Sequence, residues 1–278
     1  MEMVGRSPST TIEAPSYRSD VFFKSPSERI VLREHRFAWE SEQARELIDV
    51  HADYWTFAVA DLDEDLVSVR TSDGETKSLV GPTAIFLPGF SVVEFLLKRG
   101  TVHWCYLLST GAAPVSTSSG PLAFKLHDLD CAMDLIKGPS AQLAAWIQAH
   151  AILGLSIEKN SYPHVVSVRV KQLIDQRFRE AQDLSPIFTE LGFSSSAASR
   201  LFKRTYGLSP VQYRNQLRVM QAGTDLIFGA ESVEKAHLGV GLEDPSYFYQ
   251  RFREHMNTTP ARFRVSSAPP GPNAVAPL

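Results

Sequence analysis

Two stretches in the last third of the chain decide the fold: residues 194–213 read SSSAASRLFKRTYGLSPVQY, and residues 245–264 read PSYFYQRFREHMNTTPARFR. Each follows a short segment of helical pattern that ends at a glycine, Gly192 in the first copy and Gly241 in the second. In both stretches apolar residues recur with the period of about 3.6 that is typical of an amphipathic helix. A helix, a tight glycine turn and a second helix form a helix-turn-helix, a unit that places its second helix in the major groove of DNA.

The helix-turn-helix pattern occurs twice, over residues 184–207 and 232–257, and a longer helix is predicted between the copies over residues 210–227. Ser209 is expected to cap this connecting helix, and Pro210 to occupy its first position, where proline is favoured. One helical hairpin of this kind is a weak signal, since many helical proteins contain one. Two copies joined by a capped helix favour a DNA-binding domain.

Helix geometry predicts which side of each second helix faces outward. Ala198, Leu201 and Phe202 share one side of the first, and Phe248 and Phe252 share one side of the second, so these residues are expected to pack inward. The candidate DNA-binding residues are those of the polar sides and the serine that precedes the first helix: Ser194, Ser195, Ser196, Ser199, Arg200 and Lys203, then Pro245, Ser246, Tyr249, Gln250 and Arg253.

Several short motifs resemble the signature of the AraC/XylS family of bacterial transcription regulators. The first half of that signature is matched by Arg200-Leu201-Phe202-Lys203, Gly207-Leu208-Ser209-Pro210, Tyr213 and Arg218. The second half is matched by Ser246-Tyr247-Phe248, Phe252-Arg253, Thr259-Pro260 and Phe263-Arg264. The resemblance covers residues 184–264 and implies an AraC-type DNA-binding domain over residues 161–264. It also implies a regulator of transcription rather than an enzyme.

The resemblance implies that the two recognition helices enter successive major-groove segments on one face of double-stranded DNA. Arginine can form a bidentate hydrogen bond to guanine and glutamine to adenine, whereas serine accepts several bases. Ser194 and the N-termini of the helices are expected to contact phosphates. The family's base-reading positions fall on Ser196, Ser199 and Arg200 in the first unit and on Ser246, Tyr249 and Gln250 in the second.

The sequence departs from the family pattern inside both units. A small alanine is usual in the first helix of each unit, where two helices cross closely, but Phe188 and His237 occupy these positions. Ala198 stands where the family has a leucine, so the larger Phe188 beside the smaller Ala198 is interpreted as a volume exchange that keeps the core filled. His237 has no such compensation in the sequence, and we expect it to weaken or tilt the second unit.

The first half of the chain has the pattern of an antiparallel β domain. Asp73-Gly74 predicts a hairpin, because these residues accept the positive φ of a tight turn. Many short strands with such turns indicate a jelly roll, and this hairpin with the strand up to Pro88 is similar to the family's cupin-like sensor domain. The expected fold is therefore α+β, with an N-terminal cupin-like β jelly-roll sensor domain, a helical linker and a C-terminal all-α domain. Strands are predicted over residues 29–39, 54–62, 66–71, 77–80, 83–87, 92–97 and 102–107.

The linker is predicted to contain two helices, over residues 128–137 and from Ser140, as N-cap, to about Glu158. The apolar side of the second helix either packs on the β domain or also forms a dimer interface. The expected organisation is a flexible N-terminal arm over residues 1–27, a cupin-like sensor domain over 28–127, a helical linker and dimerisation region over 128–160, the DNA-binding domain over 161–264 and a disordered tail over 265–278.

The composition is that of a globular protein with an uneven charge distribution. The chain carries 28 Lys and Arg against 31 Asp and Glu, but residues 164–264 hold 14 of the basic and only 10 of the acidic residues. This region has a net charge of +4 and the rest of the chain −7, which favours a polyanion as the partner of the helical half. Cys105 and Cys131 have no metal-ligand spacing, and no signal peptide or membrane-spanning run is found. We therefore expect a cytoplasmic protein associated with the nucleoid.

Two other interpretations stay open at this level. A metal-dependent cupin enzyme would need convergent ligands, but His35, His51 and His103 are scattered, so neither a metal nor a cofactor is expected. Alternatively, the N-terminal domain binds no ligand and only forms dimers. The expected partners are double-stranded DNA, a small-molecule effector in the N-terminal domain, a second copy in a homodimer and, for an activator, RNA polymerase. An effector pocket could be lined by Trp55, Phe57, Phe86, Phe95 and Trp104.

Overall fold

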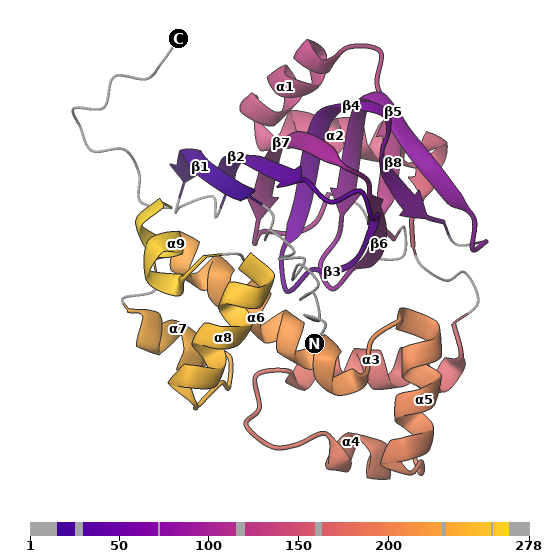
Figure 1. Ribbon diagram of the computed structural model, residues 1–278, viewed down its shortest axis with the longest axis vertical. Helices are drawn as coiled ribbons and strands as arrows, with labels where there is room; N and C mark the ends of the chain where they lie inside the picture. Colours follow the sequence, from indigo (N-terminus) through magenta and orange to yellow (C-terminus); the bar gives the residue numbers. More distant parts are fainter. Residues whose placement is uncertain are drawn as a thin grey trace, which may run out of the picture.

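The computed structural model describes residues 16–25, 30–71, 73–114, 120–158, 163–229, 232–256 and 258–266. In Figure 1 the strands occupy the upper part of the molecule, together with α1 (Leu129–Lys137) and α2 (Ser140–His150), and the remaining helices lie below them. The predicted α+β fold, a β domain followed by an all-helical domain, is confirmed.

Every strand pair of the β domain is antiparallel, as the sequence pattern predicted. The main sheet has the strand order β1-β2-β7-β4-β5-β8-β9, while β3 pairs with β6, which also pairs with β4. The sheet curls, as Figure 1 shows, and this curled sheet is called the barrel below. Its interior holds a cluster of buried apolar side chains. The strands are β1 (Ser16–Ser25), β2 (Ile30–Trp39), β3 (Arg45–Val50), β4 (Trp55–Arg70), β5 (Thr76–Leu87), β6 (Val92–Leu97), β7 (Gly100–Ser109), β8 (Leu122–Lys125) and β9 (Leu155–Ser156).

The strand pattern differs from the prediction in several places. Residues 16–25, assigned to a flexible arm, form β1 and pair with β2, and strands β3, β8 and β9 were not predicted. β4 and β5 each run through a point where two separate strands were expected, because Asp65 and Gly81 take positive φ angles of 65° and 70° without ending the strand. Of the predicted disordered tail, only residues 265–266 are described, and they belong to a helix; Asn257 lies outside the described residues.

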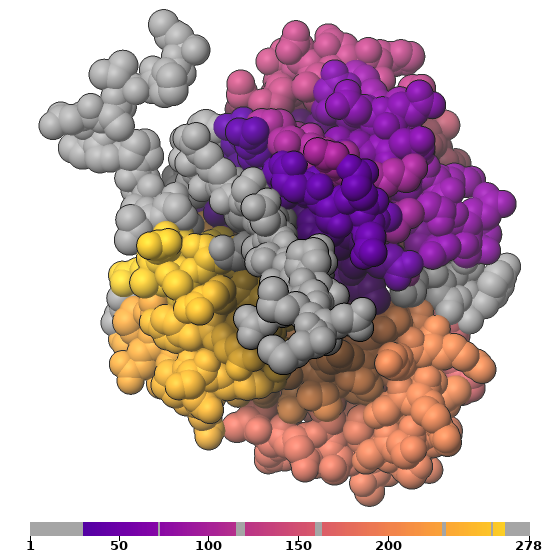
Figure 2. Space-filling model, viewed as in Figure 1, coloured from indigo at the N-terminus to yellow at the C-terminus, as the bar shows by residue number. Residues whose placement is uncertain are grey.

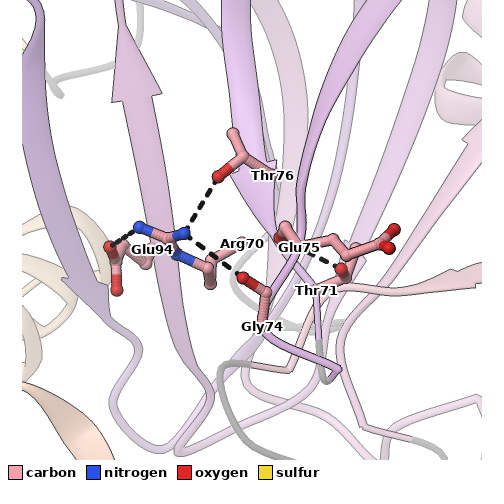
Figure 3. A network of polar contacts seen from close by, with 6 residues as sticks. All are labelled: Arg70, Thr71, Gly74, Glu75, Thr76 and Glu94. Carbon is pink, nitrogen blue, oxygen red and sulfur yellow. Dashed lines mark hydrogen bonds and ion pairs between the residues drawn. The ribbon is translucent and has the colours of Figure 1, made fainter.

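The Asp73-Gly74 hairpin is confirmed, and Gly74 takes the positive φ, 85°, that the turn requires. Arg70, at the end of β4, fixes this hairpin to the neighbouring strands (Figure 3). Its Nη1 donates to the carbonyl of Gly74 at 3.3 Å and to the hydroxyl of Thr76 at 3.0 Å, and its Nη2 lies 3.4 Å from the carboxylate of Glu94 on β6. The guanidinium therefore joins three strands at one end of the barrel.

The helices α1 and α2 pack on the outside of the main sheet. Ile136, Leu143 and Ile147 are buried in one cluster with Phe57 and other residues of the sheet, so the interpretation that this apolar face packs on the β domain is confirmed. The predicted cap is wrong: Pro139, which has no side-chain hydrogen bond, is the N-cap of α2. The helix also ends at His150 instead of continuing to Glu158, and β9 follows it after a short 3-10 turn.

The helical half contains both predicted hairpins and the helix between them. Ser209 accepts a hydrogen bond from the backbone N–H of Gln212, whose side chain accepts from the backbone N–H of Ser209, so the predicted cap is confirmed as a full capping box. The described helices are α3 (Val165–Arg177), α4 (Ser185–Glu190), α5 (Ser195–Tyr206), α6 (Pro210–Phe228), α7 (Val233–Gly239), α8 (Pro245–Met256) and α9 (Pro260–Ser266). Within the described ranges no helix is long and apolar enough to cross a membrane.

The β domain and the helical half are packed directly against each other (Figure 2). Val31 of β2 is fully buried in the apolar cluster of α6, α8 and α9. The backbone N–H of Asp53 donates to the side chain of Gln221 on α6 at 3.3 Å. Phe90 lies edge-on to Phe178, which follows α3, with 6.3 Å between ring centroids. The connecting helix α6 and the segment after α3 therefore contact the β domain, and the second helix-turn-helix unit shares an apolar cluster with it.

Candidate nucleic-acid interface

The two helix-turn-helix units, α4–α5 and α7–α8, repeat the same local geometry. In both, the turn between the helices contains a glycine with positive φ, 71° at Gly192 and 75° at Gly241. An L-residue rarely adopts this conformation, which explains why glycine stands at the same place in both copies. The positions of both predicted turns are confirmed.

The second helices of the two units, α5 and α8, are called recognition helices for their position in the helix-turn-helix, and they have different N-terminal caps. Ser194 accepts a hydrogen bond from the backbone N–H of Ala197 at 3.3 Å, and its hydroxyl proton stays available for a phosphate. Asp244 caps α8, because its carboxylate accepts from the backbone N–H groups of Ser246 and Tyr247 at 2.8 and 3.2 Å. Asp244 was not predicted as a cap, although an aspartate directly before a proline is a common helix start. One recognition helix therefore begins with a neutral cap and the other with a negative one.

The outward faces of both recognition helices agree with helix geometry. Ala198 and Phe202 of α5 are fully buried, as are Phe248 and Phe252 of α8. Ser199 is half-buried. The other predicted residues are exposed: Ser194, Ser195, Ser196, Arg200, Lys203, Pro245, Ser246, Tyr249, Gln250 and Arg253.

The polar groups on the two faces are not equally free. The side chains of Arg200, Lys203 and Arg253 are exposed and have no hydrogen bond or ion pair to any described residue, so their charges face solvent. The amide of Gln250, in contrast, donates to the carboxylate of Glu254 at 2.9 Å, and Glu254 also pairs with Arg251 at 2.7 Å. A bidentate bond from Gln250 to a base would require this intrahelical bond to break.

Arg218 on the connecting helix α6 holds the two units in a fixed relation. This buried side chain donates through Nε to the carbonyl of Phe178 at 2.5 Å and through Nη2 to the carbonyl of Glu180, both in the segment after α3. Burial lowers the pKa of Arg218 to about 10, with the neighbouring Arg214 as the second cause. The backbone of Gly241 packs against the carbonyl of Arg179 in the same segment. The turn of the second unit is therefore fixed to the loop that precedes the first.

The substituted positions in the first helices, Phe188 and His237, are both buried. Phe188 and Ala198 are buried in the same apolar cluster, and the expectation that they touch stays a prediction. His237 is also buried, and the expectation that it lacks compensation is wrong. Its Nδ1 donates to the carbonyl of Leu242 at 2.6 Å, and its ring stacks on Phe248 with 5.3 Å between centroids. The imidazole fills the space with an aromatic contact and has its hydrogen bond satisfied.

A cavity of about 290 Å³ lies in the barrel, and its mouth is lined by α6, the last turn of α8 and α9. Of the aromatic residues predicted to line a pocket, Phe95 and Trp104 do so. Trp55, Phe57 and Phe86 instead belong to the cluster under α1 and α2, because they point to the opposite face of the sheet. Among the residues that the structure describes, no three His, Cys, Asp or Glu side chains are grouped so that they could hold a metal ion.

Comparisons with known proteins agree with this arrangement. A family model described as a helix-turn-helix domain matches residues 187–266. The chain is 30% identical over 108 residues to the probable transcription factor PqrA of Proteus vulgaris, covering 38% of this chain and 88% of PqrA. It is 26% identical over 98 residues to the virulence regulon transcriptional activator VirF of Yersinia enterocolitica, covering 35% of this chain and 36% of VirF.

The fold is also found among solved structures. An apo form of a ToxT point variant from Vibrio cholerae aligns with a TM-score of 0.55 at 10% identity, covering 86% of this chain and 98% of ToxT. Wild-type ToxT with a bound unsaturated fatty acid aligns with a TM-score of 0.53 at 12% identity, covering 94% and 98%. At this identity the likeness shows the fold alone.

A β domain joined to two helix-turn-helix units defines the class of the protein, a DNA-binding regulator of transcription. The chain belongs to the AraC/XylS family of transcription regulators. It spans about a third of the length of relatives such as VirF.

Proposed function

We propose that this protein is a sequence-specific regulator whose recognition helices α5 and α8 read adjacent major-groove segments of one duplex. The observation that carries the proposal is the pair of exposed recognition helices held in one fixed relation by Arg218 and Gly241. Successive major-groove segments on one face of B-DNA are about one helical turn apart. Because the connection between the units is rigid, one protein can place both helices in two successive major-groove segments at once. Binding then avoids the entropy cost of ordering two independent units.

Arg200 is the main base-reading residue of the proposal. It is exposed, it has no partner among the described residues, and it stands at a family base-contact position, where a guanidinium can bond to the O6 and N7 atoms of guanine. Lys203 lies one turn further along α5 and is assigned to phosphate, as is Arg253 at the end of α8. In the second unit, Tyr249 and Gln250 supply the base contacts, together with Ser246.

The barrel is proposed as the sensor of a small-molecule effector. The cavity is lined by strands on one side and by helices of the DNA-binding half on the other, so an occupant would contact both. Fold neighbours support the idea, since solved ToxT structures hold an unsaturated fatty acid or a naphthalenyl butenoic acid. A homodimer, a contact with RNA polymerase and a cytoplasmic location complete the proposal. The nearly fully exposed side chains of Ile152 (90%) and Leu153 (77%), beyond the end of α2, are the favoured dimer contact.

The test is a footprint of the full chain on a duplex selected from a random pool. We expect two protected major-groove segments, about one helical turn apart on the same face. Affinity should fall steeply with added salt, with a slope of about −0.9 in log–log form for each neutralised phosphate. Protection of a single segment, or an affinity that does not change between low and physiological salt, would contradict the proposal.

A further inference from the structure

The cavity inside the barrel contains one buried cation, Arg33 of β2. It is only 2% exposed, and the wall of the same cavity also contains apolar residues of several strands, among them Ile85, Leu87 and Val102. The guanidinium lies over the ring of Phe263 on α9, 4.7 Å from the ring centroid. Nε and Nη2 have no hydrogen-bond partner among the described residues. An aromatic face compensates part of the cost of burying a charge, but leaves the donors of the guanidinium unused.

The carboxylates near the cavity are already engaged elsewhere. Asp49 accepts from Nε2 of His51 at 3.2 Å, and this histidine keeps the pKa of Asp49 low although burial acts to raise it. Glu254 accepts from Gln250 and Arg251 on its own helix. Among the described residues, neither carboxylate forms an ion pair with Arg33.

The other basic groups in the cavity wall do not add a second buried positive charge. Burial, followed by the charge of Arg33, lowers the pKa of His35 to about 4, so this imidazole is neutral near pH 7. His255 has its pKa lowered by burial as well. Arg45 lies over the rings of Phe37 and Trp39. The cavity therefore combines an apolar interior with one buried, fixed cation whose donors are unpaired among the described residues.

We propose that this cavity binds a small amphipathic organic anion, with its carboxylate on the Nε–Nη2 edge of Arg33 and its apolar body among the aliphatic side chains of the barrel. The inference rests on the proposed role of the barrel as a sensor and names the class of its effector. The Nε–Nη2 edge carries two parallel N–H donors, a geometry that matches the two oxygens of a carboxylate. A neutral ligand of the same shape would leave these donors unpaired.

The structure also assigns the helix on which such a ligand acts. The cavity wall contains Glu254, His255 and Met256, which form the last turn of the second recognition helix α8, and Phe263 of α9. The methyl group of Met256 packs against Gly223 of α6. No described residue of α4 or α5 lines the cavity. The connecting helix α6 also lines the cavity. A bound anion therefore contacts the second helix-turn-helix unit directly, and it reaches the first unit only through α6.

The binding test uses decanoate as the probe, with decanol and butyrate as controls for its charge and its chain. Trp104 lines the cavity and serves as the fluorescent reporter. Decanoate should bind the wild-type chain, and Arg33→Gln should weaken it roughly tenfold to a hundredfold, since a charged hydrogen-bonding partner is lost. Arg36→Gln is the matched control, because Arg36 is an exposed arginine on the same strand. Decanol should bind all three proteins equally and more weakly than decanoate, and butyrate should bind poorly.

Arg33→Gln removes a buried charge, so it is expected to fold, and a thermal melt without ligand checks this. The proposal is overturned if decanoate does not bind, if Arg33→Gln binds it as well as the wild type, or if decanol binds as tightly as decanoate. Footprints with and without decanoate test the output: protection of the segment contacted by α8 should change more than protection of the segment contacted by α5. Unchanged specific footprints would overturn the assignment of α8 while leaving the proposed DNA-binding function intact. If decanoate binds but the protein gives no specific footprint on the selected duplex, the proposed DNA-binding function is contradicted.

Discussion

The two helix-turn-helix units share one fold, but their surroundings differ. The first recognition helix begins at the neutral Ser194, carries three exposed cations without a described partner (Arg200, Lys203 and Arg204) and follows a turn at Gly192 that is open to solvent. The second begins at the negatively charged Asp244, and its turn is packed against the loop after α3. Its last turn also forms part of the cavity wall. Under the proposed function, the two units therefore have different roles. The first unit supplies the stronger electrostatic attraction to DNA, and the second unit responds to a ligand bound in the barrel.

The largest effect should come from placing the same substitution in the two turns. Both glycines have positive φ, but a Cβ on Gly192 would meet open space, whereas a Cβ on Gly241 would collide with the carbonyl of Arg179. Gly192→Ala should cost about 1–2 kcal/mol for the backbone conformation alone. Gly241→Ala should cost on the order of 4 kcal/mol or more, because the backbone of the loop has to move.

Urea unfolding of the two alanine variants measures this difference in the free energy of unfolding. Gly192→Ala is the matched control for the cost of the positive φ. Equal destabilisation by both would mean that the second turn is no more constrained than the first, and the rigid connection between the units would lose its main support.

A smaller effect is expected from the way each unit fills the crossing of its two helices. In the second unit this space holds His237 stacked on Phe248. The equivalent positions in the first unit are Phe188 and Ala198, so the repeat predicts that these two side chains touch. Ala198→Leu should therefore overpack the core and cost about 1–3 kcal/mol. The double variant Phe188→Ala with Ala198→Leu has the alanine and the leucine that are usual in the family at these two positions.

The double variant sharpens the volume-exchange interpretation. If the two positions share one space, it should be more stable, by about 1 kcal/mol or more, than the sum of the two single effects predicts. Thermal or urea unfolding of the wild type, the two single variants and the double variant gives the four free energies of unfolding of this double-mutant cycle. Strictly additive effects would show that the two side chains fill separate spaces, and Phe188 would need another explanation.

The helical half could be predicted closely because its signals are local. The N-cap at Ser209, the proline that follows it and the turn glycines each act over one or two turns of helix, so no long-range information is needed. The outward faces of α5 and α8 followed from helix period alone. The prediction for His237 was wrong because its two partners, the ring of Phe248 and the carbonyl of Leu242, could not be identified from the sequence. The contact with Phe248 depends on how α7 packs against α8.

The β half was predicted less well, because strand pairing and facing are set by distant partners. β1 is a strand because it pairs with β2, and the sequence of residues 16–25 alone did not indicate this. Trp55, Phe57 and Phe86 were placed in the pocket although they face α1 and α2, since both faces of the sheet are apolar. Arg33 gave no signal in the sequence, because its burial depends on α9 covering the mouth of the barrel.

The division between the two units is tested most directly by selecting preferred DNA sequences for the wild type and for single alanine variants. Arg200→Ala should cost about 1–3 kcal/mol on the preferred duplex and relax the choice of base at one position of one segment. Gln250→Ala should relax a position in the adjacent segment. Lys203→Ala is the control, since a phosphate contact should weaken all sequences about equally. If Arg200→Ala weakens preferred and random duplexes to the same extent, or if the Arg200 and Gln250 variants relax the same segment, the account of two helices reading two adjacent segments is contradicted.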